Sequence, residues 1–477
     1  MANLKEKLCF PVFELIGRAA DEAGLETYVV GGFVRDTVMK RACKDIDIVT
    51  IGSGIQLAEK LQEKIGKGSK ISVFRNFGTA MLHFRDGDED WQVEFVGARK
   101  ESYSHDSRKP VVEDGTLEDD QNRRDFTINA MAICLNRNRY GELTDPFDGC
   151  SDIKKQIIRT PSDPDITFSD DPLRMLRAIR FATQLDFSIH PDTFEAIKLN
   201  AYRIEKVSME RNIDEINKMM LSSHPSMGFR LLDKSGLLER LFPELVRLKG
   251  TESIGERSHK DNFKHTLEVL DNISKKSDDL FLRWAAVLHD IGKPYCKRYD
   301  EKMGFSFHGH ELKGSRMVKS IFRRLKLPLN EKMKYVEKLV SLHLRPIVLA
   351  EDIVTDSAVR RLIFDAGDDI DDLMLLCQAD ITSKNSYKVK QYMHNFEIVK
   401  QKMLEIEEKD RVRNFQPPVC GEEIMKIFDL APCKEIGVLK TAVKDAILDG
   451  IIPNEKQAAL GLLYSEAAKL GLKPHEQ

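Results

Sequence analysis

Apolar residues recur along the chain with two spacings, and the alternation between them predicts the first domain. Residues 8–24 carry apolar groups at helical spacing, and Gly24 is placed to end that helix. Residues 55–65 repeat the helical pattern. Three short runs typical of strands follow at 70–75, 79–84 and 91–96. The pattern therefore predicts a small α/β sheet domain at this end of the chain.

Beyond this domain the chain reads as largely helical. From 98 to 122 the periodicity is lost, which predicts a long loop of the mobile or functional kind. A helix is expected to start at 170–180, and helical spacing dominates from 209 to 240. Glycine, serine and charge in 249–260 indicate a domain boundary, and a charged segment after 401 precedes a last helical module. These shifts predict an α+β protein with domain boundaries at 249–260 and near 401.

Composition narrows the class of protein. At 477 residues the chain is too long for one hydrophobic core. Its 74 Lys and Arg against 77 Asp and Glu give a net charge of −3. Any polyanion must therefore bind to local basic patches. The eight cysteines form no Cys-x-x-Cys pair, which favours reduced thiols. No apolar run is long enough to span a membrane, and the first residues show no cleavable export pattern. We expect a cytoplasmic protein with no membrane contact and no obligate protein partner.

Two glycines followed by two carboxylates form the most informative chemical pattern. An apolar run ends at Gly31 and Gly32, and Asp45 and Asp47 stand one residue apart in a second run. Side chains alternate along a strand, so both carboxylates project from one face and can hold divalent metals, while glycines admit a bulky anion. Glu94 adds a third carboxylate if its strand lies beside theirs; a solvated strand Glu is equally compatible. Phosphoryl or nucleotidyl transfer is the first hypothesis, although each feature alone also fits a plain turn or strand edge.

Arginine and aspartate occur together at two later points. Arg124 and Asp125 stand at the mouth of an apolar element, where they could hold a triphosphate and a ribose hydroxyl or simply form a capping ion pair. Asp171, Arg174 and Arg177 follow at spacings of three and are expected to share one helical face. That row fits the reading of a base edge, and it also fits a surface ladder of ion pairs.

Histidines and aspartates of the later helical region form a second constellation. Widely spaced imidazoles and carboxylates on several helices can converge on a divalent metal in a bundle core, whereas a lone buried histidine is more often only a core residue. The candidates are His265, His289, Asp290, His308, His310, His343 and Asp380.

The motifs together resemble the bacterial class II tRNA nucleotidyltransferases, the CCA-adding and poly(A) polymerase family, with an HD domain. The matching blocks are Gly31-Gly32-x-x-Arg35-Asp36 with Asp45-x-Asp47, then Arg124-Asp125, then Asp171-x-x-Arg174 and Glu210-Arg211. The base-selecting block is normally Glu-Asp-x-x-Arg and here begins with Asp170, which leaves the pairing residues intact. The resemblance implies a polymerase β-like head at 1–155, a helical neck at 156–248, an HD-type domain at 249–400 and a tRNA-binding tail at 401–477.

The resemblance also implies a reaction and its residues. CCA would be added to the 3′ end of tRNA from CTP and ATP, by nucleotidyl transfer with two Mg²⁺ ions at Asp45 and Asp47, and Glu94 is the third catalytic candidate. Asp171 would accept from a base amine and Arg174 would donate to cytosine. The nucleotide-binding set is Gly31, Gly32, Arg35, Arg124, Asp125, Asn129, Asp171, Arg174, Arg177 and Arg180.

The HD resemblance implies a second metal site, and several alternatives stay open. Its ligands would be His265, His289, Asp290 and Asp380, with His310 and His343 for a second position, and a phosphodiesterase or phosphatase activity. Phosphate contacts to tRNA are expected from Arg177, Arg180, Arg203 and Lys206. The alternatives are a CC-adding, A-adding or poly(A)-adding relative, an HD phosphohydrolase whose first half only binds nucleotides, and a non-catalytic RNA-binding scaffold.

Overall fold

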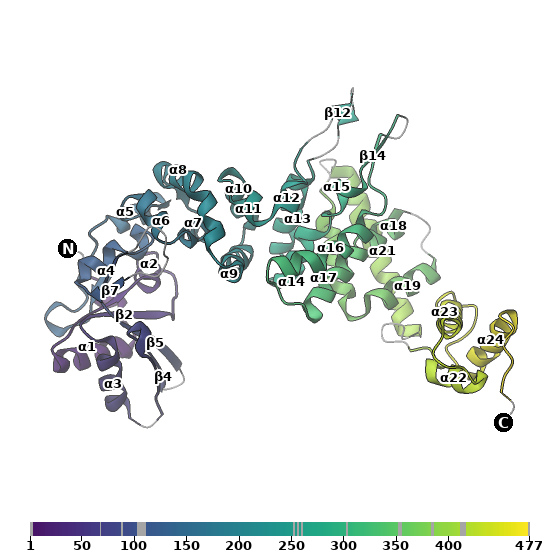
Figure 1. The fold of residues 1–477 in the computed structure, drawn as a ribbon, viewed down its shortest axis with the longest axis horizontal. Coiled ribbons are helices and arrows are strands. Elements are labelled where there is room, and N and C mark those ends of the chain that lie inside the picture. Colours follow the sequence, from purple (N-terminus) through teal and green to yellow (C-terminus); the bar gives the residue numbers. More distant parts are fainter. Residues whose placement is uncertain are drawn as a thin grey trace. The chain divides into compact units, whose positions relative to one another are not determined.

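The chain folds into two compact units, Met1–Pro243 and Glu244–Gln477, drawn as ribbons in Figure 1. The computed structural model describes residues 3–66, 68–86, 89–102, 111–250, 253–254, 257–258, 261–301, 304–351, 355–382, 386–410 and 416–475. The first unit combines a mixed sheet with helices and the second is mainly helical, so the predicted α+β class is confirmed.

A seven-stranded mixed sheet forms the body of the first unit, in the order β3-β4-β5-β2-β1-β8-β9. Its strands are β1 (Glu26–Val30), β2 (Ile46–Ile51), β3 (Lys70–Phe74), β4 (Thr79–Asp86), β5 (Glu89–Gly97), β8 (Ala132–Cys134) and β9 (Leu143–Thr144). β2 and β5 run parallel and the other neighbours run antiparallel. The three strands expected between residues 70 and 96 are all present.

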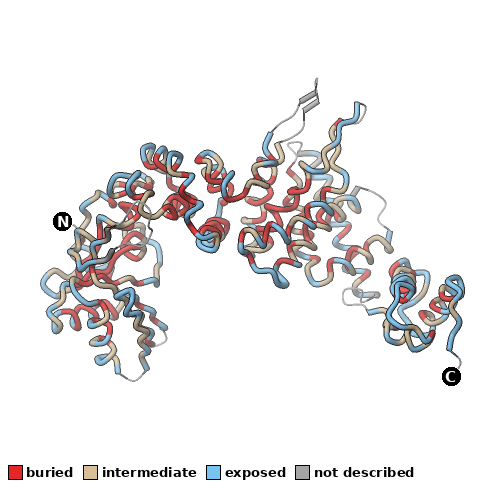
Figure 2. The backbone as a smooth tube through the Cα atoms, viewed as in Figure 1, coloured by how far each residue is buried: buried red, intermediate tan, exposed pale blue. Residues whose placement is uncertain are grey.

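Helices α1 (Pro11–Ala23) and α3 (Gly54–Ile65) cover one face of this sheet. Their apolar sides pack on the strand residues that point toward them, including Val29 and Ile48, to form the main core. Gly24 ends α1 in the left-handed conformation, as the spacing predicted. Figure 2 shows buried residues along the strands and the inward sides of these helices.

The other face of the sheet carries the polar chemistry. Val30 on β1 pairs with Asp47 on β2, and Asp47 pairs with Glu94 on β5, so the two carboxylates share the side away from α1 and α3. Only a small apolar cluster, which includes Tyr28 and Val49, lies on this side. Strand alternation thus separates the core from the candidate site.

The segment 98–122 is more ordered than its sequence suggested. Strands β6 (Arg99–Ser102) and β7 (Val111–Asp114) pair antiparallel, and α4 (Leu117–Asn122) follows with a capping box between Thr116 and Asp119. The expectation of a long loop is therefore wrong for these parts, while residues 103–110 lie outside the described chain. Strands are recognised by apolar and polar residues in alternation, and the many charged residues of this short hairpin obscure that alternation.

Helices complete the first unit. α7 packs against α9 and α10, and this layer follows the sheet domain in sequence. The helices are α2 (Gly32–Val38), α5 (Gly149–Lys155), α6 (Pro164–Asp170), α7 (Leu173–Leu185), α8 (Pro191–Asn200), α9 (Met209–Met220), α10 (Pro225–Lys234) and α11 (Leu237–Leu241), with the strand pair β10 (Ile157–Ile158) and β11 (Ser188–Ile189).

The second unit begins with a helical bundle around α13, α14, α16, α17 and α20. Its helices are α13 (Asn262–Ser274), α14 (Leu280–Leu288), α15 (Lys293–Cys296), α16 (His310–Arg324), α17 (Glu331–Leu342), α18 (Arg345–Glu351), α19 (Asp356–Ala366), α20 (Ile370–Asp380), α21 (Ser386–Asp410), α22 (Gly421–Phe428), α23 (Lys434–Leu448) and α24 (Lys456–Lys469). Among the helices of the described segments, none has both the length and the apolar character needed to cross a bilayer.

Candidate active site and metal centre

Three carboxylates gather on the sheet face opposite α1 and α3. Asp45 is exposed just before β2, Asp47 lies within β2, and Glu94 is exposed directly across from Asp47 on β5. Burial raises the pKa of Asp47 to about 6, and the charge of Asp45 adds to the shift while the guanidinium of Arg124 opposes it. A divalent cation beside Asp47 would stabilise the ionised carboxylate that burial disfavours, and such cations prefer oxygen ligands. The residues present therefore fit a magnesium-type ion.

Gly31 fits tightly into this site. It follows β1 with a φ of 71°, a region that favours glycine. A Cβ atom added there would lie 3.3 Å from both Asp47 Oδ2 and Arg124 Nη1. A Cβ at Gly32 would meet only Arg35 Nη2, at 3.8 Å. Gly31 is thus the glycine that the local geometry requires.

Arg35 on α2 starts a hydrogen-bonded chain that reaches α7. Its Nε and Nη2 each donate to Asp36 at 2.9 Å, and its Nη1 donates to Asn129 Oδ1 at 2.9 Å. The Asn129 amide in turn donates to Asp125 Oδ1 at 3.0 Å. Arg177 of α7 completes the chain through Nε to Asp125 Oδ2 at 2.7 Å. Four predicted nucleotide-binding residues therefore form one connected network.

Asp125 is held by this network as an anion. It is 7% exposed and also accepts from the backbone N–H of Phe126. Burial alone would raise the pKa of Asp125, but the guanidinium of Arg177 and the Asn129 amide outweigh it and lower the pKa below its ordinary value. With the second Arg177 bond at 2.6 Å, all four acceptor positions of the carboxylate are occupied within the protein.

Asp120 is a functional candidate that the sequence reasoning missed. It is fully buried on α4 and accepts from Arg124 Nε at 3.0 Å and from Arg123 Nε at 3.0 Å. Burial opposes ionisation of Asp120, but the two arginines lower its pKa below the ordinary value. The i,i+4 spacing to Arg124 was the available signal. Asp120 thereby fixes the arginine that reaches Gly31 and Asp47.

The row of residues predicted to select the base, Asp171, Arg174 and Arg177, is only partly on a helix. Asp171 lies before α7, and its Oδ1 accepts from the backbone N–H of Leu173 at 3.2 Å, so the expectation of one shared helical face is wrong for Asp171. Arg174 Nη2 donates to the carbonyl of Arg123 at 2.6 Å. The row therefore combines a helix-capping carboxylate with arginines of the first turns.

Arg180 points to a different partner from the one expected. Its Nε donates to Glu215 of α9, and its Nη1 donates to Gln184 at 2.8 Å. Burial lowers the pKa of Arg180, while Glu215 opposes this change. Arg203 is 5% exposed and donates to the carbonyl of Ser169. The prediction that Arg177, Arg180, Arg203 and Lys206 form an exposed patch for tRNA phosphates is therefore wrong. Of these four residues only Lys206 is exposed.

The second unit brings the HD residues together at the helix ends. His265 Nε2 lies 2.8 Å from Asp380 Oδ1, and His289 Nε2 lies 3.6 Å from the same oxygen. Asp290 Oδ2 is 3.5 Å from His265 Nε2 and 3.3 Å from His289 Nε2. These four residues surround one point with two imidazoles and two carboxylates, a donor set suited to a transition metal.

His310 and His343 approach the other oxygen of Asp290. Their Nε2 atoms lie 3.3 and 4.0 Å from Asp290 Oδ1, and both nitrogens are buried with no hydrogen-bond partner among the described residues. Burial and the charge of His289 lower the pKa of His343 to about 4, which keeps this imidazole neutral. Neutral buried nitrogens aimed at a carboxylate fit a metal ion.

Backbone carbonyls orient most of these rings. The Nδ1 atoms of His289, His310 and His343 lie 2.8, 2.8 and 2.7 Å from carbonyl oxygens of their own helices or turns. His265 Nδ1 instead lies 2.9 Å from Thr382 Oγ1. Each contact leaves Nε2 facing inward, as outer partners do in metal sites. His308 is exposed, so the structure does not place it with the cluster around Asp290.

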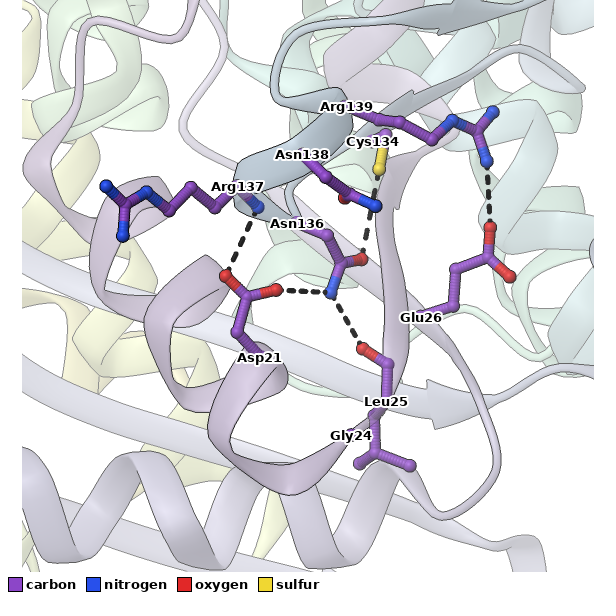
Figure 3. Close-up of a pocket in the computed structure, with 9 residues that line it drawn as sticks. All are labelled: Asp21, Gly24, Leu25, Glu26, Cys134, Asn136, Arg137, Asn138 and Arg139. Atoms are coloured by element: carbon purple, nitrogen blue, oxygen red, sulfur yellow. Dashed lines mark hydrogen bonds and ion pairs between the residues drawn. The ribbon is translucent and has the colours of Figure 1, made fainter.

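A pocket of about 740 Å³ lies at the opposite end of β1 from Gly31 (Figure 3). The side-chain amide of Asn136 donates to Asp21 and to the carbonyl of Leu25, each at 2.9 Å, and Arg139 pairs with Glu26 at 3.0 Å. These polar groups form hydrogen bonds with one another, so the walls of the pocket connect α1, β1 and the end of β8.

The sheet with its carboxylates is the arrangement of a nucleotidyltransferase head, and the histidine cluster marks a helical domain with a candidate metal centre. Family models agree with this division. They match the Poly A polymerase head domain at residues 27–159, the probable RNA and SrmB-binding site of polymerase A at 186–248, and the HD domain at 262–385.

Relatives with known names cover most of the chain. The multifunctional CCA protein of Shewanella frigidimarina is 32% identical over 390 residues, which is 77% of this chain and 86% of that protein. The A-adding tRNA nucleotidyltransferase of Deinococcus radiodurans is 33% identical over 355 residues, with 72% and 78% covered. The chain belongs to the tRNA nucleotidyltransferase family with a poly A polymerase head, which confirms the resemblance.

Solved structures show the same fold. The apo form I of a CCA-adding enzyme has a TM-score of 0.64 at 23% identity and covers 97% of each chain. The Thermotoga maritima CCA-adding enzyme complexed with tRNA has a TM-score of 0.61 at 23% identity, with 97% of this chain and 98% of that chain covered. The similarity extends through both units.

Proposed function

We propose that this chain adds CCA to the 3′ end of tRNA from CTP and ATP. The observation that carries the proposal is the placement of Asp47, Glu94, Gly31 and Arg124 around one point of the sheet face. Relatives named for CCA and A addition, at 32% and 33% identity, support it. Structures of family members with ATP, CTP and tRNA support the same substrates.

Asp45 and Asp47 would hold Mg²⁺, with Glu94 as the third carboxylate of the site. Bound Mg²⁺ supplies Lewis-acid chemistry, which eases deprotonation of the tRNA 3′-hydroxyl and balances triphosphate charge. The hydroxyl oxygen forms a bond to the α-phosphorus of the nucleotide, and the bond to pyrophosphate breaks. Arg124, fixed by Asp120, contributes positive charge beside Asp47, and Gly31 leaves room for the phosphates.

Asp171 and Arg174 would select the base. Arg174 donates to acceptor atoms of cytosine, and Asp171 accepts from the exocyclic amine of cytosine or adenine, so UTP and GTP leave a polar group unpaired. Arg177 positions Asp125 rather than reaching outward. Direct contact of Asp125 with the ribose stays a prediction, since its acceptor positions are used within the protein.

A primer-extension experiment tests the proposed reaction. The protein with Mg²⁺ is given tRNA that ends before C74, C75 or A76 and one labelled nucleotide at a time. We expect two C additions followed by one A, and Asp45→Ala should abolish all three. Incorporation of A alone, C alone or many A residues would assign one of the partial activities. Phosphate release with no primer extension would contradict nucleotidyl transfer altogether.

For the second unit we infer a two-metal phosphohydrolase centre. Asp290 would help to hold both metals, because its Oδ2 faces His265 and His289 and its Oδ1 faces His310 and His343. Asp380 would complete the first position. When bound, the metals supply Lewis-acid activation of a phosphate ester. The buried unpartnered Nε2 atoms favour this function over a purely structural bundle.

Metal analysis tests the second centre directly. Protein purified with Mn²⁺ should carry two ions per chain in this unit, and His343→Ala should reduce the content to one while leaving Asp380-dependent binding intact. Asp290→Ala should remove both, because Asp290 belongs to both candidate ligand groups. A metal content that is unchanged by Asp290→Ala would contradict the assignment.

Other predictions about the chain remain open. The division at 155, 248 and 400 stays a prediction beside the two observed units, as does a tRNA-binding role for the tail. A cytoplasmic location is supported by eight cysteines that are all free of disulfides.

A further inference from the structure

Phe181 on α7 lies where three arginines converge. The residue is 7% exposed, and the guanidinium carbons of Arg35, Arg177 and Arg180 lie 5.1, 5.4 and 4.0 Å from the centroid of its ring. Phe126 meets the same ring edge-on, with the centroids 5.8 Å apart. One buried aromatic ring therefore contacts a head arginine and two neck arginines.

Each of these arginines has its own carboxylate. The pairs are Arg35–Asp36, Arg177–Asp125 and Arg180–Glu215. The carboxylates belong to α2, to the turn before residues 127–129, and to α9. Because every guanidinium is balanced, three cations can approach one ring with little net repulsion.

The face of an aromatic ring attracts a guanidinium, and the attraction grows when water is excluded. Leu at the same position offers apolar contact without that electrostatic attraction. Phe181 thus does more than fill volume, because the ring specifies where the planar ends of Arg35 and Arg177 lie.

These two arginines serve different parts of the candidate site. Arg35 follows the glycine pair and holds Asn129, whereas Arg177 holds Asp125 and shares α7 with Arg174. A shift of the ring would move both ends of the network that joins the head to α7.

We propose that Phe181 is a positioning residue that sets the placement of α7, and therefore of Arg174, against the glycine and carboxylate side of the head. Its ring sharpens selection of CTP over UTP without touching either nucleotide. The inference rests on the proposed function, since it needs Asp171 and Arg174 to read the base.

Steady-state incorporation of CTP and UTP onto a tRNA that lacks CCA tests this role. Phe181→Leu should lower the ratio of kcat/KM for CTP over UTP about tenfold, while Phe181→Tyr, which keeps the ring face, should stay within about threefold of the wild-type ratio. Phe181→Met, flexible and without a ring, serves as a second test if the Leu variant fails to fold.

Phe229→Leu is the matched control. Phe229 is 1% exposed on α10, which packs against α7, so its loss should lower thermal stability as much as Phe181→Leu but preserve the ratio. The inference is overturned if the ring-free Phe181 variants keep wild-type selectivity, or if Phe229→Leu loses as much. Unchanged selectivity in Arg174→Ala would instead contradict the proposed base reading, which separates the two failures.

Discussion

The two candidate metal centres differ in how firmly the chain holds their ligands. In the first unit, Asp45 and Glu94 are exposed on an open sheet face beside the half-buried Asp47. In the second unit, His289 and His343 are fully buried, and their outer nitrogens contact backbone carbonyls. One site offers only carboxylate oxygens, and the other offers imidazoles together with carboxylates.

This difference indicates two modes of metal use. An open set of oxygens must admit a triphosphate and a tRNA end, so it suits an exchangeable Mg²⁺ that arrives with the nucleotide. Pre-oriented imidazoles in a closed cluster suit a resident transition metal. We therefore expect the first site to bind its metal transiently and the second to hold a resident metal, and the following experiments distinguish these two modes.

Asp47→Asn should lower nucleotide incorporation about a thousandfold. The same change should stabilise the metal-free protein at pH 8. The pKa of Asp47 is raised from 3.8 to about 6, so its charge destabilises the fold above pH 6 and the cost disappears as pH falls toward 3.8. Thermal unfolding of both proteins at pH 8 and pH 5 measures this gain, which should shrink at the lower pH. An Asn variant less stable than wild type at pH 8 would contradict the electrostatic account.

Chelation should abolish both activities, and the metal that restores each should differ. After EDTA treatment and dialysis, Mg²⁺ alone should restore more than about half of the nucleotide incorporation, because the open carboxylates exchange metal readily. Phosphatase activity should need Mn²⁺, Co²⁺ or Ni²⁺. Recovery of both activities with Mg²⁺ alone would remove the distinction between the centres.

Gly31→Ala should lower incorporation about a hundredfold, because a methyl group there is strained and crowds Asp47 and Arg124. Gly32→Ala is the matched control and should stay within about threefold, since its Cβ meets nothing closer than 3.8 Å. Single-turnover rates on one tRNA primer compare the two. Equal losses would show that both glycines approach the nucleotide.

In the first unit, the sequence predicted the parts of the candidate site that are local in the chain. Gly31, Asp45 and Asp47 lie in one short segment, so strand alternation was enough to place both carboxylates on a common face. The sequence did not reveal which strand lies beside β2. The structure shows that β5 pairs with β2 and places Glu94 opposite Asp47.

The sequence failed where function depends on buried partners. Asp120 lay in the segment 98–122 that was expected to be a loop, yet it is fully buried and holds Arg124 in place. Arg180 and Arg203 looked like surface charge and are instead paired inside the neck. Charge alone does not reveal which side of a helix faces the core, and Phe181 gave no signal because an aromatic residue at helical spacing is ordinary core.

Asn136→Ala should have the smallest effect on activity, with a clear effect on stability. Loss of its bonds to Asp21 and Leu25 should lower the free energy of unfolding by about 2 kcal/mol while incorporation stays near wild type, because the pocket of Figure 3 is structural. Urea unfolding and primer extension measure the two effects. Strong loss of incorporation in a well-folded variant would make that pocket a functional site.

We propose that one open carboxylate site catalyses CCA addition, and that Asp171 and Arg174, elsewhere in the first unit, select the base. Sequencing of the 3′ ends of a tRNA lacking CCA, after incubation with all four nucleotides, tests it most directly. Wild-type protein should yield CCA, Asp45→Ala should yield unextended tRNA, and Arg174→Ala should yield extended ends of mixed sequence. Correct CCA ends from Arg174→Ala, or any extension by Asp45→Ala, would contradict the account.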